Sequence, residues 1–99
     1  MKEYPTDEEL ETIKNWNFLK QPLDGFLSLL ESIWKYADIG FFDLSGKKIL
    51  KLELHTGGWS GNENTISAIQ NNYIFWMICW IKSTRGGHYY FKINRKLFK

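Results

Sequence analysis

Apolar side chains recur at helical spacing in two stretches near the start of the chain. The first follows Thr6, whose hydroxyl and the carboxylate of Glu9 fit the capping box that opens a helix. The second follows Pro22, because proline is tolerated in the first turn of a helix, and its apolar positions continue to Ala37. The sequence therefore predicts two N-terminal helices, one that begins after Thr6 and one that runs from Pro22 to about Tyr36.

The next part of the chain has the period of two that is typical of strands. Residues 39–44 and 47–55 are predicted to form two strands joined by a tight turn at residues 45 and 46. A two-residue loop sets a register in which Phe41 pairs with Leu50. In that register one face is apolar and the other is mixed. The apolar face carries Ile39, Phe41, Leu50, Leu52 and Leu54, and the mixed face carries Phe42, Ile49, Lys51, Glu53 and His55.

Three glycines within residues 56–62 predict a loop with unusual backbone angles. Ser60 followed by Glu63 fits a second capping box, which predicts a short helix over about residues 61–70. The run from residue 73 to residue 82 is apolar on both alternating faces, which is typical of a central strand covered on both sides.

A glycine-rich turn at residues 83–87 and a last strand at residues 88–93 complete the pattern. The expected fold is an α+β domain over residues 1–99. It has a four-stranded, mostly antiparallel sheet, two N-terminal helices, and one short helix between strands two and three. Residues 94–99 are predicted to form a basic tail. The pattern leaves open whether strands two and three are parallel. If one sheet face stays uncovered, the aromatic strand over residues 73–82 offers an interface, and we expect a homodimer or a partner protein on that face.

Composition and charge narrow the class of protein. The chain is 43% hydrophobic and 17% aromatic, which is enough for a packed core. One cysteine excludes an intrachain disulfide, and the longest apolar run is far shorter than a membrane-spanning helix, so we expect a cytoplasmic protein without a membrane partner. Net charge is −4 over residues 1–31 and +6 over residues 82–99. Such a basic end attracts nucleic acid or an acidic partner, or it faces the acidic first helix.

Two groups of residues are candidates for a binding site. The loop around Trp59 leads to a helix start at Asn62 and Glu63, and its tryptophan either closes over the core or stands exposed as a binding anchor. The final hairpin carries cations beside aromatic rings, an arrangement that holds single-stranded nucleic acid by stacking. Its members are Arg85, His88, Tyr90 and Lys92.

Candidate chemistry is sparse. Glu53 and His55 lie two residues apart on one strand face, where a carboxylate beside an imidazole could do acid–base work or form a surface pair. Adding His88 and Cys79 gives a set of metal-ligand types, but their spacing matches no zinc pattern. The sequence therefore predicts no metal site, no cofactor and no catalytic residue.

The segment from Leu52 to Glu63, together with residues 75–76, Trp80 and residues 85–89, resembles short uncharacterised proteins encoded by bacteriophages and prophages. The resemblance implies a small protein made in an infected bacterial cell that binds and blocks a host protein, including host defence enzymes. Three hypotheses follow from the sequence. They are a non-enzymatic binding protein of the phage type that inhibits a host defence or regulatory factor, a single-stranded nucleic-acid binder, and a small enzyme or nucleotide-ligand binder around Glu53, His55 and His88.

Overall fold

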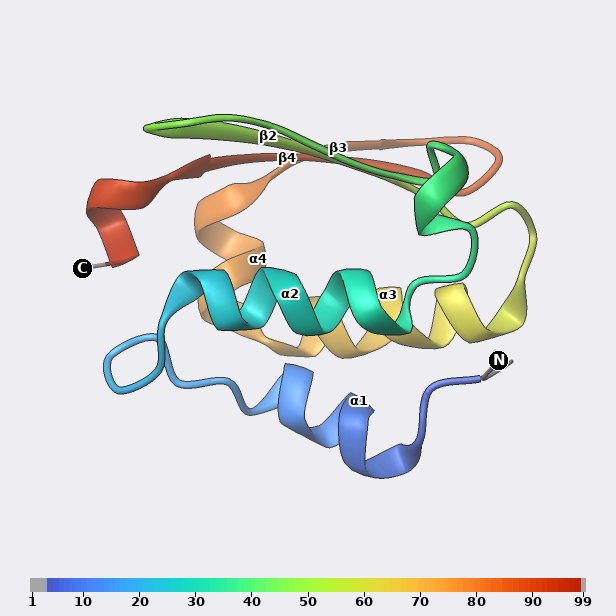
Figure 1. Ribbon diagram of the computed structural model, residues 1–99, viewed down its shortest axis with the longest axis horizontal. Coiled ribbons are helices and arrows are strands. Elements are labelled where there is room, and N and C mark those ends of the chain that lie inside the picture. Colours follow the sequence, from blue (N-terminus) through green and yellow to red (C-terminus); the bar gives the residue numbers. More distant parts are fainter. Residues whose placement is uncertain (1–3, 99) are drawn as a thin grey trace.

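A four-stranded sheet lies over a layer of helices in the computed structural model, which describes residues 4–98 (Figure 1). The four α-helices of residues 4–98 lie on the same side of the sheet, and no helix of these residues covers its other face. In chain order the elements are α1 (Asp7–Lys14), α2 (Leu23–Ile33), the 3-10 helix η1 (Ala37–Ile39), β1 (Phe42–Gly46), β2 (Ile49–His55), α3 (Ser60–Asn71), α4 (Tyr73–Cys79), β3 (Trp80–Thr84), β4 (His88–Asn94) and the 3-10 helix η2 (Arg95–Phe98).

The strands are arranged in the order β1-β2-β4-β3, and every neighbouring pair is antiparallel. This confirms the predicted α+β class and the four-stranded antiparallel sheet. It also answers the question about strands two and three. Because β4 lies between β2 and β3 and is antiparallel to both, those two strands run in the same direction without pairing.

The helix starts follow local patterns to different degrees. At α1 the Thr6 hydroxyl accepts from the Glu9 amide at 3.1 Å, and the Thr6 amide donates to the Glu9 carboxylate at 2.9 Å, so the predicted capping box is confirmed. At α3 the second predicted capping box is wrong, because Trp59 is the N-cap and no side chain caps the helix. The Ser60 hydroxyl instead donates to the Tyr4 hydroxyl at 3.4 Å.

Helix α2 ends at Ile33, earlier than the predicted end near Tyr36. The reason is a contact from a distant part of the chain. The side chain of Asn62 accepts from the Lys35 amide at 2.8 Å and donates to the Lys35 carbonyl at 3.2 Å, so this backbone is held outside the helix. Tyr36 then takes a left-handed conformation, with φ of 65°, and Ala37 belongs to η1.

The predicted register of the first hairpin is wrong. Phe42 pairs with Leu54 and Gly46 pairs with Leu50, so Phe42 points into the core beside the leucines of β2. Gly46 has φ of 98°, and a Cβ at this position would collide with the carbonyl oxygen of Ile49. The turn therefore passes through the two lysines after Gly46, and Ile39, expected in the first strand, is exposed in η1.

The predicted central strand over residues 73–82 is also wrong, because the segment is split into helix α4 and edge strand β3. The cause is Asn72, whose side-chain oxygen accepts from the Phe75 amide at 3.3 Å and so caps α4. Its amide group donates to the carbonyls of Ile13 at 3.0 Å and Trp16 at 3.2 Å, which fixes the start of α4 against the end of α1.

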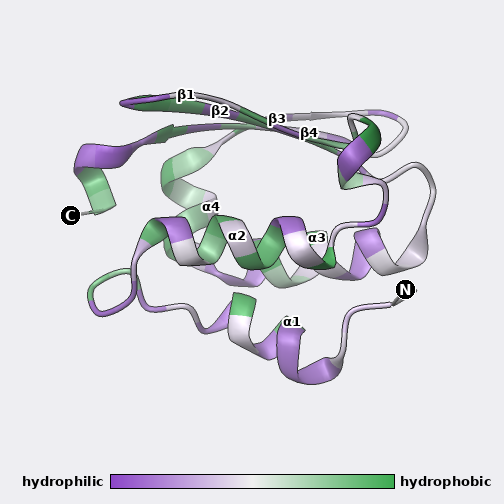
Figure 2. Cartoon of the chain, viewed as in Figure 1, coloured by the Kyte–Doolittle hydropathy of each residue, from purple (hydrophilic) through white to green (hydrophobic). Residues whose placement is uncertain are grey.

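The core lies between the sheet and the helices. Figure 2 shows that α1 is mainly hydrophilic, whereas hydrophobic residues recur along α2. Phe75 is central to the core, because its ring lies 4.8 Å from that of Phe26 and 5.6 Å from that of Phe91. Phe18 lies 5.0 Å from Phe26 and 5.0 Å from Phe98, measured between ring centroids.

The predicted basic tail is largely ordered against the domain. Asn94 ends β4, and Arg95 begins η2. The Arg95 guanidinium lies 2.9 Å from the carboxylate of Asp24 and donates to the Lys47 carbonyl at 2.7 Å. One basic residue of this segment is therefore paired with an acid of α2. Lys99 lies outside the described residues.

Candidate binding surfaces

The helix-free face of the sheet brings together five of the residues that the sequence predicts as binding residues. Pairing between β2 and β4 places His55 opposite His88 and Glu53 opposite Tyr90, with Lys92 opposite Lys51. Side chains alternate between the two faces of a sheet, so His88, Tyr90 and Lys92 share the face that carries no helix.

The two histidines of this face form a direct hydrogen bond, with 2.7 Å between their Nδ1 atoms. One Nδ1 must therefore carry a proton while the other accepts it. The Nε2 atom of His55 lies 3.8 Å from the carboxylate of Glu53, and both side chains are partly exposed. The carboxylate and the two imidazoles thus form a row of polar groups on the helix-free face of the sheet. Within residues 4–98 no group of three or more metal-ligand side chains is close enough to hold a metal ion.

The same face is basic next to the histidine pair. The ammonium group of Lys82 lies over the ring of Tyr90, 5.0 Å from its centroid. Both residues line a shallow hollow of about 200 Å3 together with Lys51 and Lys92. Glu53 is the acid of this hollow. Such a hollow offers positive charge beside an aromatic ring, which suits an anionic ligand with a flat group.

The other predicted binding residues lie elsewhere. Arg85 is exposed in the turn between β3 and β4, and Glu63 is exposed in the first turn of α3. Asn62 is only 1% exposed, and its side chain bonds the backbone of Lys35 and Thr56, so it holds the fold together. We therefore leave Asn62 out of the binding surface.

The sequence left open whether Trp59 closes over the core or stands exposed as a binding anchor. Its side chain is half-buried, so it does part of each. Its ring stacks on Tyr4 at 5.7 Å between centroids, and the ammonium group of Lys35 lies 4.4 Å from its centroid. The ring therefore closes over the side of the domain where the N-terminal segment meets the end of α2, and it retains a partly exposed edge.

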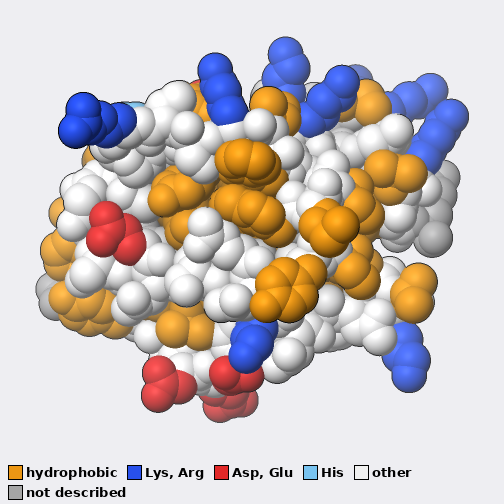
Figure 3. Space-filling model, turned by 180° about the vertical axis from the view of Figure 1, so that it is seen from behind, with side chains coloured by type: hydrophobic (Ala, Val, Ile, Leu, Met, Phe, Trp, Pro, Cys, Tyr) orange, Lys and Arg blue, Asp and Glu red, His pale blue; other side chains and the backbone are white. Residues whose placement is uncertain are grey.

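The segment expected to offer an interface as a strand forms an exposed apolar surface on α4 and β3, but the residues that it exposes were not predicted. It consists of one face of α4 and the first residue of β3, namely Tyr73, Ile74, Met77, Ile78 and Trp80, all of them exposed. Figure 3 shows apolar side chains gathered in the middle of this side of the molecule. We call it the α4–β3 surface. The strand prediction hid it, because a strand covered on both faces would have buried all of these residues.

Cys79 lies at the inner side of α4, and burial raises the pKa of its thiol to about 12. At pH 8 this lowers the thiolate fraction about a thousandfold relative to an ordinary thiol. We expect a disulfide reagent such as DTNB to label the native protein at least about a thousandfold more slowly than the protein unfolded in urea. Absorbance at 412 nm measures both rates. Labelling of the native protein at a rate within tenfold of the unfolded one would contradict this burial.

A comparison of the chain with protein families, curated proteins and solved structures finds no match. Within residues 4–98, no helix is both long and apolar enough to cross a membrane. We therefore infer a function from the surfaces of the molecule. Two of them offer contacts to another molecule, the basic face of the sheet and the α4–β3 surface.

Proposed function

We propose that this chain is a non-enzymatic binding protein that docks on another protein through the α4–β3 surface. The observation that carries the proposal is the exposure of large apolar side chains on one continuous stretch of chain. Met77 is 82% exposed and Tyr73 is 70% exposed, although the buried side of the same helix packs closely in the core. Contiguous apolar side chains of this kind mark interaction sites on soluble proteins.

The charges beside the α4–β3 surface indicate the chemistry of the partner. Lys82 lies two residues after Trp80 in β3, and residues 82–99 contain six basic residues and no acidic residue. Figure 3 shows Lys and Arg side chains along one margin of this side of the molecule. A partner with an apolar patch bordered by Asp and Glu would complement both features.

A second copy of the chain suits the α4–β3 surface less well than a different protein does. In a symmetric dimer the same patch meets itself, so one direction of the twofold axis brings the basic margins of the two copies together. Like charges across an interface oppose association. We therefore propose a different protein as the partner. The resemblance to bacteriophage proteins extends this proposal to a bacterial host protein, with a defence or regulatory factor as the target that the chain inhibits.

The test compares two aspartate substitutions at exposed apolar residues. Met77→Asp places a charge in the α4–β3 surface, and Leu19→Asp places one at a residue that is 92% exposed between α1 and α2. We expect the wild type and Leu19→Asp to capture the same protein from nuclease-treated bacterial lysate, and Met77→Asp to lose it. With the purified partner, Met77→Asp should raise the Kd at least about tenfold.

The outcomes separate the alternatives. Equal binding by Met77→Asp and the wild type would contradict the proposed surface. Wild-type dimers in multi-angle light scattering that Met77→Asp converts to monomers would show that a second copy occupies it. Circular dichroism of both variants checks that the fold is retained.

A second candidate function is binding of single-stranded nucleic acid on the helix-free face of the sheet. The cation of Lys82 over the Tyr90 ring favours it, because stacking beside positive charge holds unpaired bases. In this case the captured material disappears after nuclease treatment, and binding of an oligonucleotide weakens steeply between 50 and 200 mM salt. Binding through apolar contacts changes much less over the same range.

A further inference from the structure

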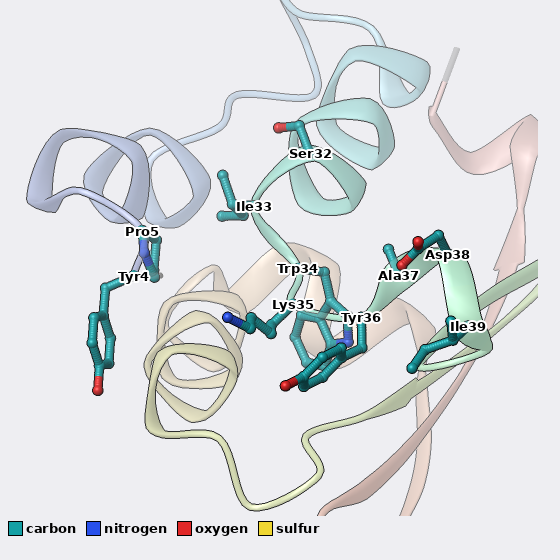
Figure 4. A pocket seen from close by; sticks show the side chains of 10 residues that line it. All are labelled: Tyr4, Pro5, Ser32, Ile33, Trp34, Lys35, Tyr36, Ala37, Asp38 and Ile39. Carbon is teal, nitrogen blue, oxygen red and sulfur yellow. The ribbon is translucent and has the colours of Figure 1, made fainter. Parts of the chain in front are cut away.

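A hollow separate from both surfaces opens between the N-terminal segment and the connection from α2 to η1 (Figure 4). Its volume is about 560 Å3, and Tyr4, Pro5 and residues 32–39 line it. This volume lies within the range of small-molecule sites, which are mostly apolar with a few placed polar groups. We call it the Trp34 hollow.

The backbone around the Trp34 hollow is held in place before any ligand arrives. The side chain of Asn62, in α3, forms hydrogen bonds with the amide and the carbonyl of Lys35. Tyr36 has φ of 65°, a conformation that is uncommon for a tyrosine. Unusual backbone conformations of this kind concentrate at ligand sites. The hollow is therefore preformed.

Two polar groups of the Trp34 hollow lack the partners that such groups usually have. The indole N–H of Trp34, a residue 4% exposed, has no hydrogen-bond acceptor within the described part of the chain. Buried donors without an acceptor are rare in folded proteins, so this N–H marks a cost in free energy below the hollow.

The second such group is the ammonium of Lys35. It lies over the rings of Trp59 and Tyr36, at 4.4 Å and 5.4 Å from their centroids. Among residues 4–98 no carboxylate is within ion-pair distance of it. The acid of the hollow is Asp38, and Figure 4 shows its carboxylate at the opposite end, turned away from Lys35. The end of the hollow beside Lys35 therefore favours an anion.

We propose that the Trp34 hollow binds a small aromatic carboxylate. The flat ring packs among the side chains of Tyr4, Ile33 and Tyr36, and the carboxylate pairs with Lys35. A rigid planar acid fits this chemistry because it combines apolar area with one negative charge.

The experiment titrates the full chain with indole-3-acetate and with its uncharged amide, indole-3-acetamide. The five tryptophans give five indole N–H signals in a proton–nitrogen correlation spectrum, and triple-resonance assignment identifies that of Trp34. We expect the Trp34 signal to shift on addition of the acid, with a Kd of about 1 mM or tighter for a ligand of this size. The amide should bind at least about fivefold more weakly.

Two matched lysine variants test whether the positive charge of Lys35 causes the preference for the acid. Lys35→Met keeps the unbranched side chain to within one atom and leaves the backbone bonds to Asn62, and it should remove the preference for the acid over the amide. Lys20→Met, at an exposed lysine between α1 and α2, should leave that preference unchanged. Equal affinity of the wild type for acid and amide, or shifts confined to residues outside the hollow at 10 mM indole-3-acetate, would overturn the proposal.

Discussion

Phe75→Ala is expected to lower the free energy of unfolding by about 3–5 kcal/mol, whereas Met77→Ala should change it by less than about 0.5 kcal/mol. The two residues lie on one turn of α4 and face opposite ways. Phe75 is 0% exposed and contacts the rings of Phe26 and Phe91, so its loss leaves a cavity in the core. Met77 is exposed, so its truncation removes little packing. Urea unfolding followed by circular dichroism measures both values.

The pair of variants also discriminates between a helix and a strand over this segment. In a strand, residues two apart point to the same face, so Phe75 and Met77 would be buried or exposed together. In a helix they lie about 200° apart around the axis. Losses of similar size for the two variants would therefore contradict helix α4 and restore the strand predicted from the sequence.

Asn62→Ala is expected to cost about 2–4 kcal/mol of stability, the second large effect. The substitution leaves the amide and carbonyl of Lys35 and the carbonyl of Thr56 without their side-chain partner. Asn64→Ala is the matched control, because Asn64 lies in the same helix and is exposed. Thermal and urea unfolding of both variants measures the difference, and we expect less than about 0.5 kcal/mol for Asn64→Ala.

A small effect of Asn62→Ala would show that water replaces the side chain at Lys35. Such a result would also weaken the case for a preformed Trp34 hollow, because Asn62 is the contact that holds its backbone. If instead the variant is folded but destabilised as expected, the Trp34 indole signal should differ from that of the wild type before any ligand is added.

The elements that the sequence predicts correctly are those with local causes. The start of α1 depends on Thr6 and Glu9, three residues apart, and β4 follows a turn whose glycines have positive φ. The elements that it misses have distant causes. Helix α4 begins where it does because Asn72 bonds the carbonyls of Ile13 and Trp16, a contact across more than fifty residues.

The candidate surfaces also differ in whether their causes are local or distant in the sequence. Alternation along a strand was enough to group His88, Tyr90 and Lys92 on one face, and pairing with β2 then added Glu53 and His55. The segment of the α4–β3 surface could be predicted as an interface, but its exposed residues could not, because an apolar run indicates burial and gives no sign of which residues remain exposed. The Trp34 hollow depends on the early end of α2, which Asn62 causes from another helix.

The direct junction between α4 and β3 gives this chain an aggregation hazard that Asn72 suppresses. No loop separates the two elements, and residues 73–81 contain no charge, proline or glycine. Sequences of this composition form the stacked strands of amyloid readily. Because β3 is at the edge of the sheet, unwinding of α4 would lengthen an unprotected strand that other chains could join. We therefore expect the cap that starts α4 to protect the folded protein from self-assembly, and the apolar surface proposed for binding is the same stretch of chain that makes this protection necessary.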